Sequence, residues 1–400
     1  MGKRPRVFIV ATESSGDNYG AMLARQLRDL RPDVETYGLG GGKMESAGVT
    51  LFKNMLEHSA VGLVEVVRSL RFFLDTMDDL VQQAKELQPD VIILIDSPDF
   101  NLRIAPRLKA LNIPIVYYVS PQLWAWREGR VDQIRKYVDR MLVIFPFEVD
   151  FYAKHGIEAR FVGHPLLDII DHEQINKRAE ALRHGFKIPD SKRVVGLFPG
   201  SRRAEVSRLM PRMLDAARVI MERRKDVIFL VGCSPWFNPE RYKKAISAHE
   251  DLPLRAIHGR SYEVMALSDF SMICSGTATV EAAIVGAPFL CTYRMAWASA
   301  LLAQVLVSYE YACMVNILAG RQIIPELLQH QAEPLTMGLI ALESMETGAP
   351  KMREELAEVV KTLGGKGASR RAAEQALSVA GLRPVSRPIS TELPAVAAAN

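Results

Sequence analysis

The segment VIILIDSPDFN, residues 91–101, decides how the rest of the chain is interpreted. Its first five residues form an unbroken apolar run, which is typical of a strand buried on both faces of a parallel sheet. The run ends at Asp96, and Pro98 prevents further strand pairing and disfavours a helical Ser97. We therefore expect Asp96 just beyond the carboxyl end of a buried strand, at the edge where open α/β sheets bind ligands.

The acidic residues of this segment have a simpler alternative role. A helix is predicted from Asn101 to Leu111, and Asp is a preferred N-cap residue. Asp99 suits that position better than Asp96, which would leave the Asp96 side chain available for chemistry. The pattern alone leaves both roles open for Asp96.

Length and composition indicate a globular protein of two domains. The chain has 400 residues, of which 48% are apolar and 24% charged, so it can bury two cores. Its net charge of +4 does not indicate a nucleic-acid-binding protein, but it suits anionic substrates or an anionic membrane surface.

Cysteine and histidine usage argues against disulfides and metal sites. The four cysteines lie in the second half without a CxxC pair, and the eight histidines show no metal-ligand spacing. We expect no metal, no cofactor and a reducing cytoplasmic compartment. The apolar run of residues 7–11 is too short for a signal peptide, and no window reaches the length of a transmembrane helix.

The first domain begins with a predicted strand over residues 6–11 and a helix that ends near Leu30. The turn between them, residues 12–17, is rich in Ser and Gly and places backbone N–H groups at a helix start, where an anion can bind. Ser15 belongs to this turn, and Glu13 and Asp17 act either in the site or only as helix-start residues. The GGG run after the next strand, 34–39, lacks the spacing of a dinucleotide fingerprint.

Residues 61–77 predict a helix whose apolar stripe is wider than one core face needs. The residues that define the stripe and its basic flanks include Val66, Arg68, Leu70, Arg71 and Phe73. Such a helix lies either on a membrane surface or in an ordinary core, and the pattern taken alone favours the core.

A further buried strand over residues 113–119 leads into the segment SPQLWAWR, residues 120–127. Trp124, Trp126 and Arg127 in this segment suit a sugar or an amphipathic acceptor, and a purely structural loop fits equally well. Shorter strands follow at 141–145 and 160–162. Strands that alternate with helices predict a doubly wound parallel sheet.

The second half repeats this organisation after a polar, punctuated segment, 168–192, that reads as a linker. Strands are predicted over 193–198, 227–231, 270–274 and 289–293, with a helix from about residue 205 to Arg224. The chain beyond about Pro384 is rich in Ala, Pro and Ser, which is typical of a disordered tail.

Two turns of the second half can bind anions. Ser275, Gly276 and Thr277 open a helix whose free N–H groups and dipole can hold a diphosphate without metal, and Glu281, one turn along, can accept hydrogen bonds from ribose hydroxyls. Arg202, in the turn after residue 198, can contact phosphate through two hydrogen bonds. Alternatively, Ser275 is a plain N-cap and Glu281 a solvated helix residue.

A set of unusual motifs in a fixed order carries a resemblance to a known family. The motifs are SSGD (14–17), IDSPDFN (95–101), YVSPQLWAWR (118–127), FPFE (145–148), VGHP (162–165), PGSRRAE (199–205), SGTATVE (275–281), NILAGR (316–321) and PELL (325–328). From residue 7 to residue 333 the chain closely resembles the lipid-A-disaccharide synthase family. It departs from the family at Thr12, where glycine is usual before the Glu of the first loop.

The resemblance implies a fold and a reaction. The fold is α/β, with two doubly wound Rossmann-like domains that face a cleft, the GT-B architecture of glycosyltransferases. The family joins UDP-2,3-diacylglucosamine to 2,3-diacylglucosamine 1-phosphate (lipid X), with release of UDP and formation of a β-1,6-linked disaccharide. The resemblance implies that Asp96 is the general base and that Arg202, Glu281 and Asn316 lie on the UDP side of the site. The residue pattern by itself gives no reason to choose Asn316.

The resemblance also bears on domains and location. We expect an acceptor domain over 1–168, a linker over 169–192, a UDP-sugar domain over 193–383 whose last helix can return to the first domain, and a tail over 384–400. Because both substrates carry acyl chains, the 61–77 helix is now better interpreted as a contact for acyl chains or for the anionic inner-membrane surface. The protein would then be cytoplasmic and peripherally bound to the inner membrane, and a homo-oligomer is compatible with the sequence.

Three other functions compete with this interpretation. A UDP-sugar 2-epimerase shares the fold but would release free sugar without an acceptor. A transferase that acts on a lipid-linked muropeptide would use another acceptor, and its glycine-rich first loop differs from residues 13–17. A non-catalytic lipid- or nucleotide-binding protein would not release UDP.

Overall fold

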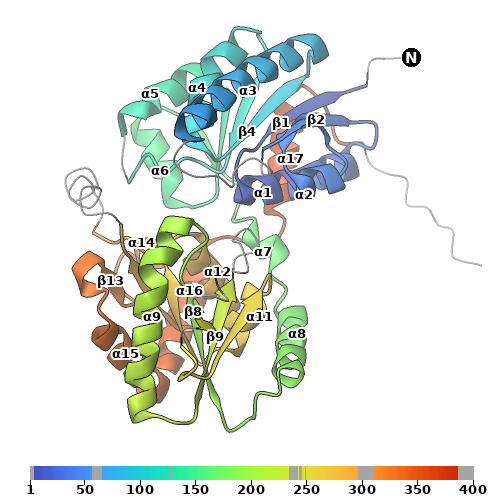
Figure 1. Ribbon diagram of the computed structural model, residues 1–400. Helices are drawn as coiled ribbons and strands as arrows, with labels where there is room; N and C mark the ends of the chain where they lie inside the picture. Colours follow the sequence, from blue (N-terminus) through green and yellow to red (C-terminus); the bar gives the residue numbers. More distant parts are fainter. Residues whose placement is uncertain are drawn as a thin grey trace, which may run out of the picture.

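The computed structural model describes residues 4–55, 65–125, 128–233, 242, 246–247, 249–295 and 310–385, and within these ranges the side chains of 65–71 and 348 are left out. The chain forms two stacked α/β bodies, each built on one parallel sheet (Figure 1). The predicted doubly wound GT-B class is therefore confirmed.

The first sheet has seven strands in the order β3-β2-β1-β4-β5-β6-β7. Its strands are β1 (Arg6–Val10), β2 (Glu35–Gly40), β3 (Thr50–Asn54), β4 (Val91–Ile95), β5 (Ile115–Tyr118), β6 (Arg140–Val143) and β7 (Ala159–Phe161). Its helices are α1 (Ser14–Leu30), α2 (Gly42–Ser46), α3 (Glu65–Leu87), α4 (Pro98–Lys109), α5 (Val131–Tyr137) and α6 (Phe147–Lys154). The order reverses between β1 and β4, so Asp96 lies at the topological switch point, where such sheets bind ligands.

Alternation along the central strands explains why β4 is apolar throughout. Ile93 and Ile95 belong to a core with helices α1 and α17, whereas Ile92 and Leu94 belong to a second core with α3 and α4. Successive side chains of a strand point to opposite faces, so a strand covered on both faces needs apolar residues at every position.

The second sheet has six strands in the order β10-β9-β8-β11-β12-β13. They are β8 (Arg193–Phe198), β9 (Val227–Cys233), β10 (Leu254–His258), β11 (Phe270–Cys274), β12 (Phe289–Tyr293) and β13 (Glu326–Leu328). The helices of this half are α7 (Leu166–Ile169), α8 (His172–Gly185), α9 (Arg203–Arg223), α11 (Ser261–Leu267), α12 (Thr277–Val285), α14 (Met314–Ala319), α15 (Pro334–Glu343), α16 (Ala349–Thr362) and α17 (Ala368–Val379).

The last helix returns to the first body. Helix α17 lies beside α1 (Figure 1), and its apolar side chains Ala372, Ala376 and Leu377 share a core with β1 and β4. The carboxylate of Asp168 accepts hydrogen bonds from the backbone N–H groups of Gly367 (2.5 Å) and Ser369 (3.0 Å) at the start of α17. The chain therefore crosses twice between the two bodies.

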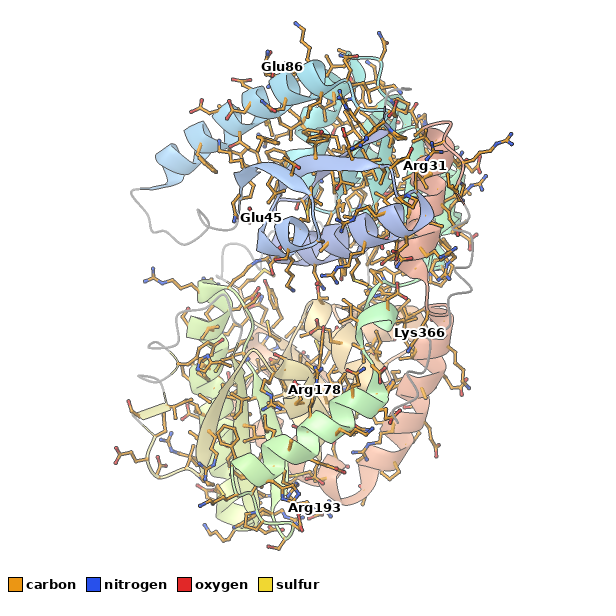
Figure 2. All side chains as sticks on the ribbon, turned by 90° about the vertical axis from the view of Figure 1, so that its right-hand side faces the viewer. Arg31, Glu45, Glu86, Arg178, Arg193 and Lys366 are labelled. Carbon is orange, nitrogen blue, oxygen red and sulfur yellow. The ribbon has the colours of Figure 1, made fainter. Side chains whose placement is uncertain are left out.

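Beyond α17 the chain contacts the carboxyl end of α1, where the Val385 N–H donates to the carbonyl oxygen of Leu30 at 2.8 Å. The Arg31 guanidinium at the end of α1 donates to the carbonyl oxygen of Arg383 at 2.9 Å, and Figure 2 shows Arg31 beside the final helix. The tail beyond residue 385 lies outside the described residues.

Several elements differ from the sequence-based expectations. The segment predicted as a linker, 169–192, contains the 14-residue helix α8, which begins with an N-cap bond from Gln174 N–H to the Asp171 carboxylate and buries Ile175, Ala179 and Leu182. Strands β3, β10 and β13 were not predicted, because β3 and β10 are polar or interrupted and β13 has only three residues.

The helix after Asp96 also begins earlier than predicted. Helix α4 begins at Pro98, Ser97 is its N-cap in a left-handed conformation, and no side chain caps it. Asp99 therefore lies inside the first turn, where its carboxylate pairs with Arg130 at 2.8 Å. The prediction that Asp99 caps this helix is wrong, because Pro98 provides a helix start with its fixed φ.

Candidate active site

Asp96 lies where β4 ends, with its backbone held between neighbouring elements. Its N–H donates to the carbonyl oxygen of Tyr118 at 3.0 Å, and its φ of 50° places it in the left-handed region. The Asp96 side chain stays partly exposed. The carboxylate is thus available at the carboxyl edge of the sheet.

The electrostatic surroundings of Asp96 suit proton transfer near neutral pH. Burial, followed by the negative charge of Glu13, raises the pKa of Asp96 to about 7. The backbone N–H of Ser97, the positive charge of Arg202 and a hydrogen bond from Ser15 lower the same pKa by smaller amounts. A carboxyl group with a pKa near the working pH can accept a proton in the reaction and release it afterwards.

Two of the three predicted residues at the start of α1 interact with Asp96, and the third does not. Glu13 is the N-cap residue of α1 and Ser15 lies in its first turn, and both interact with Asp96. Asp17, by contrast, is buried, and its carboxylate accepts hydrogen bonds from the N–H groups of Gly41 (2.8 Å), Lys43 (3.1 Å) and Met44 (3.0 Å). Asp17 therefore fixes the start of α2 and is not available to an acceptor.

Arg202 reaches toward Asp96 from the second body. It is the N-cap residue of α9, and its guanidinium lies 3.7 Å from both the Glu205 and the Glu13 carboxylates. Glu205 also accepts the N–H groups of Ser201 (3.0 Å) and Arg202 (3.1 Å), which shapes the turn. Gly200 is required in this turn, because its φ is 110° and a Cβ there would lie 2.5 Å from a Glu205 oxygen.

The start of α12 presents backbone N–H groups toward solvent. Gly276 is the N-cap residue, and both Gly276 and Thr277 are exposed. The hydroxyl group of Ser275 does not cap the helix and instead donates to the carbonyl oxygen of Ala312 at 2.9 Å. The helix start therefore offers an anion site, whereas Ser275 shapes the adjoining loop.

Glu281 lies one turn into α12, in contact with residues that the sequence did not point to. Tyr262 of α11 donates its hydroxyl hydrogen bond to Glu281 at 3.1 Å. Burial raises the pKa of Glu281, while the Tyr262 hydrogen bond and the charge of Lys43, from α2 of the first body, lower it. Glu281 is thus neither a solvated helix residue nor a lone carboxylate.

Asn316 has a different position from the one expected of a nucleotide ligand. It is fully buried, and its amide group donates to the carbonyl oxygen of Ile324 (2.9 Å) and to the Glu326 carboxylate (2.7 Å). Its oxygen accepts the N–H groups of Ile323 and Ile324, both at 2.9 Å. All four hydrogen-bonding positions of the amide are filled within the loop, which favours a role in holding the loop; placement of Asn316 on the UDP side stays a prediction.

Glu326 organises this loop and was missed by sequence reasoning. Its carboxylate accepts the N–H groups of Ala312 (2.9 Å) and Cys313 (3.1 Å) in addition to Asn316. Ala312 is also the residue whose carbonyl oxygen receives the Ser275 hydroxyl. The motif PELL contains Glu326, but without a predicted strand at β13 nothing in the sequence placed it beside α12.

Trp124 lies in the loop after β5, residues 120–127, and packs into the protein. Trp124 is buried, its indole N–H donates to the Glu148 carboxylate at 3.2 Å, and its ring meets Phe147 edge to face at 5.0 Å. Of the two roles that the sequence left open for Trp124, sugar contact or a structural loop, these contacts favour the structural one. Trp126 and Arg127 lie outside the described residues.

Helix α3 combines core and surface side chains. Phe73 meets Phe100 edge to face at 4.9 Å and packs against the first-body core, so it is not a free membrane contact. The next residue, Leu74, is 50% exposed. The side chains of Val66, Arg68, Leu70 and Arg71 lie outside the described part of the helix. Within that description, no helix is long and apolar enough to cross a membrane.

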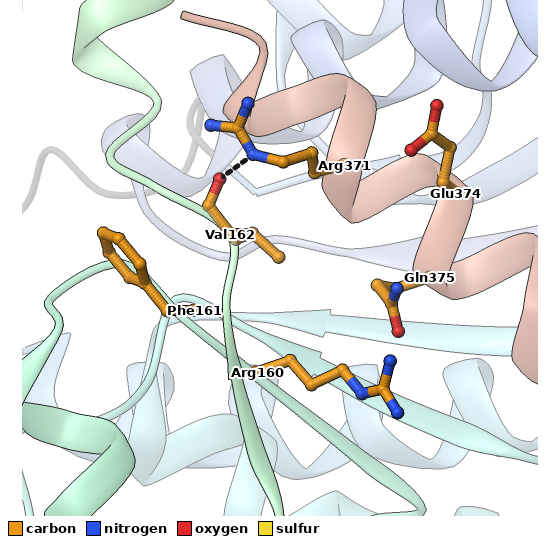
Figure 3. Close-up of a pocket in the computed structure, with 6 residues that line it drawn as sticks. All are labelled: Arg160, Phe161, Val162, Arg371, Glu374 and Gln375. Carbon is orange, nitrogen blue, oxygen red and sulfur yellow. Dashed lines mark hydrogen bonds between the residues drawn. The ribbon is translucent and has the colours of Figure 1, made fainter. Parts of the chain in front are cut away.

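A hollow of about 540 Å³ lies away from these residues, between β7 and α17 (Figure 3). It is lined by Arg160, Phe161, Val162, Arg371, Glu374 and Gln375. The Arg371 guanidinium donates to the carbonyl oxygens of Val162, Lys366 and Gly365, each at 2.8 Å, and so ties the crossing chain segments together. None of the predicted site residues lines this hollow. Among the described residues, no group of three or more His, Cys, Asp or Glu side chains is placed to hold a metal ion.

Comparison with known proteins gives consistent matches. The family model described as lipid-A-disaccharide synthetase matches residues 7–379. The lipid-A-disaccharide synthase of Syntrophus aciditrophicus is 40% identical over 375 residues, 93% of this chain and 97% of that protein. The lipid-A-disaccharide synthase of Myxococcus xanthus is 37% identical over 95% of this chain and 98% of that protein.

Solved structures with a similar fold are more distant in sequence. The UDP-GlcNAc 2-epimerase from Neisseria meningitidis bound to UDP-GlcNAc gives a TM-score of 0.66 at 12% identity, over 93% of this chain and 100% of that chain. The S. aureus MnaA–UDP co-structure gives 0.65 at 11% identity, over 96% of this chain and 100% of that chain. At this identity the likeness concerns the fold alone.

Proposed function

Because this chain belongs to the lipid-A-disaccharide synthase family, and so is a glycosyltransferase, we propose the substrates and residue roles by which it makes the lipid A disaccharide. The donor is UDP-2,3-diacylglucosamine and the acceptor is 2,3-diacylglucosamine 1-phosphate. The products are UDP and the β-1,6-linked disaccharide 1-phosphate. The observation that carries the residue roles is the Asp96 carboxyl, with its pKa raised to about 7, at a strand end that Arg202 reaches from the other body.

Asp96 acts as the general base. The acceptor hydroxyl is a weak nucleophile, so its proton must leave as its oxygen attacks the anomeric carbon of the donor. The Asp96 carboxylate takes that proton while the bond from the anomeric carbon to the UDP oxygen breaks on the opposite side. This single displacement converts an α-linked donor into a β-linked product.

The second body stabilises the leaving UDP. The free N–H groups at Gly276 and Thr277 and the Arg202 guanidinium neutralise charge that develops on the diphosphate. The Glu281 carboxylate, oriented by the Tyr262 hydroxyl at 3.1 Å, accepts hydrogen bonds from the ribose hydroxyls. Ser275, Asn316 and Glu326 act indirectly, because their hydrogen bonds fix residues 312–326 beside the start of α12.

The first body contacts the acyl chains and the membrane surface through helix α3. Leu74 is half exposed on α3, and Lys53 lies over the face of the neighbouring Phe72 ring, 4.5 Å from its centre. An exposed apolar side chain on a helix suits the boundary of a bilayer, and Lys53, which also pairs with Asp79 at 3.2 Å, packs on the adjoining Phe72 ring. These features support peripheral binding to the cytoplasmic face of the inner membrane.

Incubation with UDP-diacylglucosamine and lipid X, followed by mass spectrometry, tests the proposal. We expect disaccharide 1-phosphate and UDP in equal amounts, and no UDP without the acceptor. Release of free sugar without acceptor would instead indicate an epimerase. Binding of both substrates with no release of UDP would indicate a binding protein.

A further inference from the structure

We propose that Asn101 and Tyr117 are positioning residues that hold the backbone of Asp96 in the one conformation that aims its carboxylate into the site. This inference rests on the proposed role of Asp96 as general base. Neither residue touches a reacting atom, because both are fully buried.

The backbone at Asp96 is unusual for this sequence. Asp96 has a φ of 50° and Ser97 a φ of 44°, so two consecutive non-glycine residues adopt the left-handed conformation. Asp visits this region more readily than most residues, but serine is not among those that favour it. A turn of this kind persists only when its surroundings fix it, and such turns cluster at functional sites.

Three hydrogen bonds from the side chains of Asn101 and Tyr117 fix this turn. The Asn101 amide nitrogen donates to the carbonyl oxygens of Ile95 (3.0 Å) and Asp96 (2.7 Å). The Tyr117 hydroxyl donates to the same Asp96 oxygen at 2.5 Å. Two carbonyl groups that end the β4 ladder are thereby held by side chains, and the peptide plane of Asp96 cannot rotate without losing two bonds.

The two donors come from elements that are themselves rigid. Tyr117 lies in β5, in register with Leu94 of β4. Asn101 lies in the first turn of α4, where its own N–H donates to the carbonyl oxygen of Ser97 at 2.9 Å. Because a fixed peptide plane fixes the direction of the Cα–Cβ bond, these contacts set where the Asp96 carboxylate points.

Removal of either donor should lower turnover without weakening nucleotide binding. Tyr117→Phe removes one hydroxyl group and keeps the ring, and Asn101→Leu removes both amide donors at similar volume. A misplaced base costs up to about a hundredfold in rate, so we expect kcat to fall about tenfold in Tyr117→Phe and more in Asn101→Leu. The KM for acceptor and the Kd for UDP should stay within about twofold of wild type.

A double-mutant cycle separates positioning from general damage. If the two residues act only through Asp96, Tyr117→Phe should cost nothing further in an Asp96→Asn background. The matched control is Tyr37→Phe, which removes a partly buried hydroxyl group that donates to Glu35 at 3.0 Å, on β2 and away from the end of β4, and should leave kcat unchanged.

Two results would overturn the positioning role. One is an equal loss from Tyr117→Phe in the wild-type and Asp96→Asn backgrounds, because the residue would then act independently of the carboxylate. The other is a loss that Tyr37→Phe shares. If Asp96→Asn itself turns over normally, the proposed base is wrong and the positioning role fails with it, which is a distinct observation. Should Asn101→Leu fail to fold, the Tyr117→Phe cycle decides alone.

Discussion

The Arg202 guanidinium of the second body lies 3.7 Å from the Glu13 carboxylate of the first, and both groups act on the charge of Asp96. The two side chains are 71% and 50% exposed, so the ion pair contributes little to stability. A diphosphate that binds Arg202 would compete with Glu13 for it. In the proposed mechanism the pair would therefore link nucleotide binding to the basicity of Asp96.

Glu13 and Arg202 should move the pH dependence of the reaction in opposite directions. The negative charge of Glu13 raises the pKa of Asp96 and the positive charge of Arg202 lowers it. We expect Glu13→Gln to shift the acid limb of kcat/KM to lower pH and Arg202→Met to shift it to higher pH. The measurement is the kcat/KM profile between pH 5 and pH 9. Parallel shifts in the two variants would contradict the assignment of that limb to Asp96.

Asp96 should also make folding stability depend on pH. Burial and Glu13 raise its pKa from 3.8 to about 7, so between about pH 4 and pH 7 the folded state keeps a proton that the unfolded state has lost. Stability therefore falls as pH rises through this window, by at most about 4 kcal/mol and by less for a partly exposed group.

The variant Asp96→Asn carries no such penalty. It should be more stable than wild type at pH 8 and closest to wild type at pH 4. Urea unfolding of both proteins at the two pH values measures the difference. An advantage that is the same at both pH values would show that ionisation of Asp96 is not its cause.

The central part of the site follows from sequence because it depends on strand ends. The apolar run before Asp96 and the turns before α9 and α12 predict that these residues lie at the carboxyl edge of their own sheet, because parallel strands of one sheet all end at that edge. Helix-start residues such as Arg202 and Gly276 are then placed within a few residues.

The rest of the site depends on side-chain direction, which the pattern does not encode. Asp17 and Glu13 lie four residues apart on α1, yet one fixes the α2 start and the other faces Asp96. Asn316 is held by Glu326, which lies on a three-residue strand too short to predict. Trp124 is buried, and its indole N–H donates to Glu148, a partner 24 residues away in sequence.

Asn316→Ala and Glu281→Ala should have contrasting effects. Asn316→Ala removes the side-chain partner of the Ile323 and Ile324 N–H groups and of the Ile324 carbonyl oxygen, so we expect a loss of about 2–4 kcal/mol in the free energy of unfolding. Glu281→Ala removes a carboxylate whose pKa burial raises, so the fold should stay intact while UDP affinity falls about ten- to a hundredfold.

Calorimetric titration with UDP and thermal melting of both variants separate the two roles. A stable Asn316→Ala protein with weakened UDP binding would show that Asn316 contributes to the nucleotide site. Unchanged UDP binding by a folded Glu281→Ala protein would show that Glu281 does not contact the nucleotide.

Helix α3 offers a test of membrane contact with neighbouring residues. Leu74 is half exposed, so Leu74→Ser should weaken binding to vesicles with anionic lipids and leave the melting temperature unchanged. Phe73 packs against Phe100, so Phe73→Ala should lower stability by about 2 kcal/mol. Vesicle co-sedimentation and thermal melting of the two variants check this. Undetectable vesicle binding by the wild type would remove the membrane role from α3.

The two aspartates at the end of β4 give the sharpest test of the chemistry. Asp96→Asn keeps the shape of the side chain and removes its basicity, so turnover should fall about 10²–10⁴-fold while UDP still binds. Asp99 is 61% exposed and pairs with Arg130 at 2.8 Å, so Asp99→Asn should change stability by less than about 1 kcal/mol and leave turnover near wild type. Turnover, UDP affinity and melting temperature are measured for both variants side by side. A stable Asp99→Asn protein that binds UDP but has no activity, beside an active Asp96→Asn protein, would assign the general base to Asp99 instead.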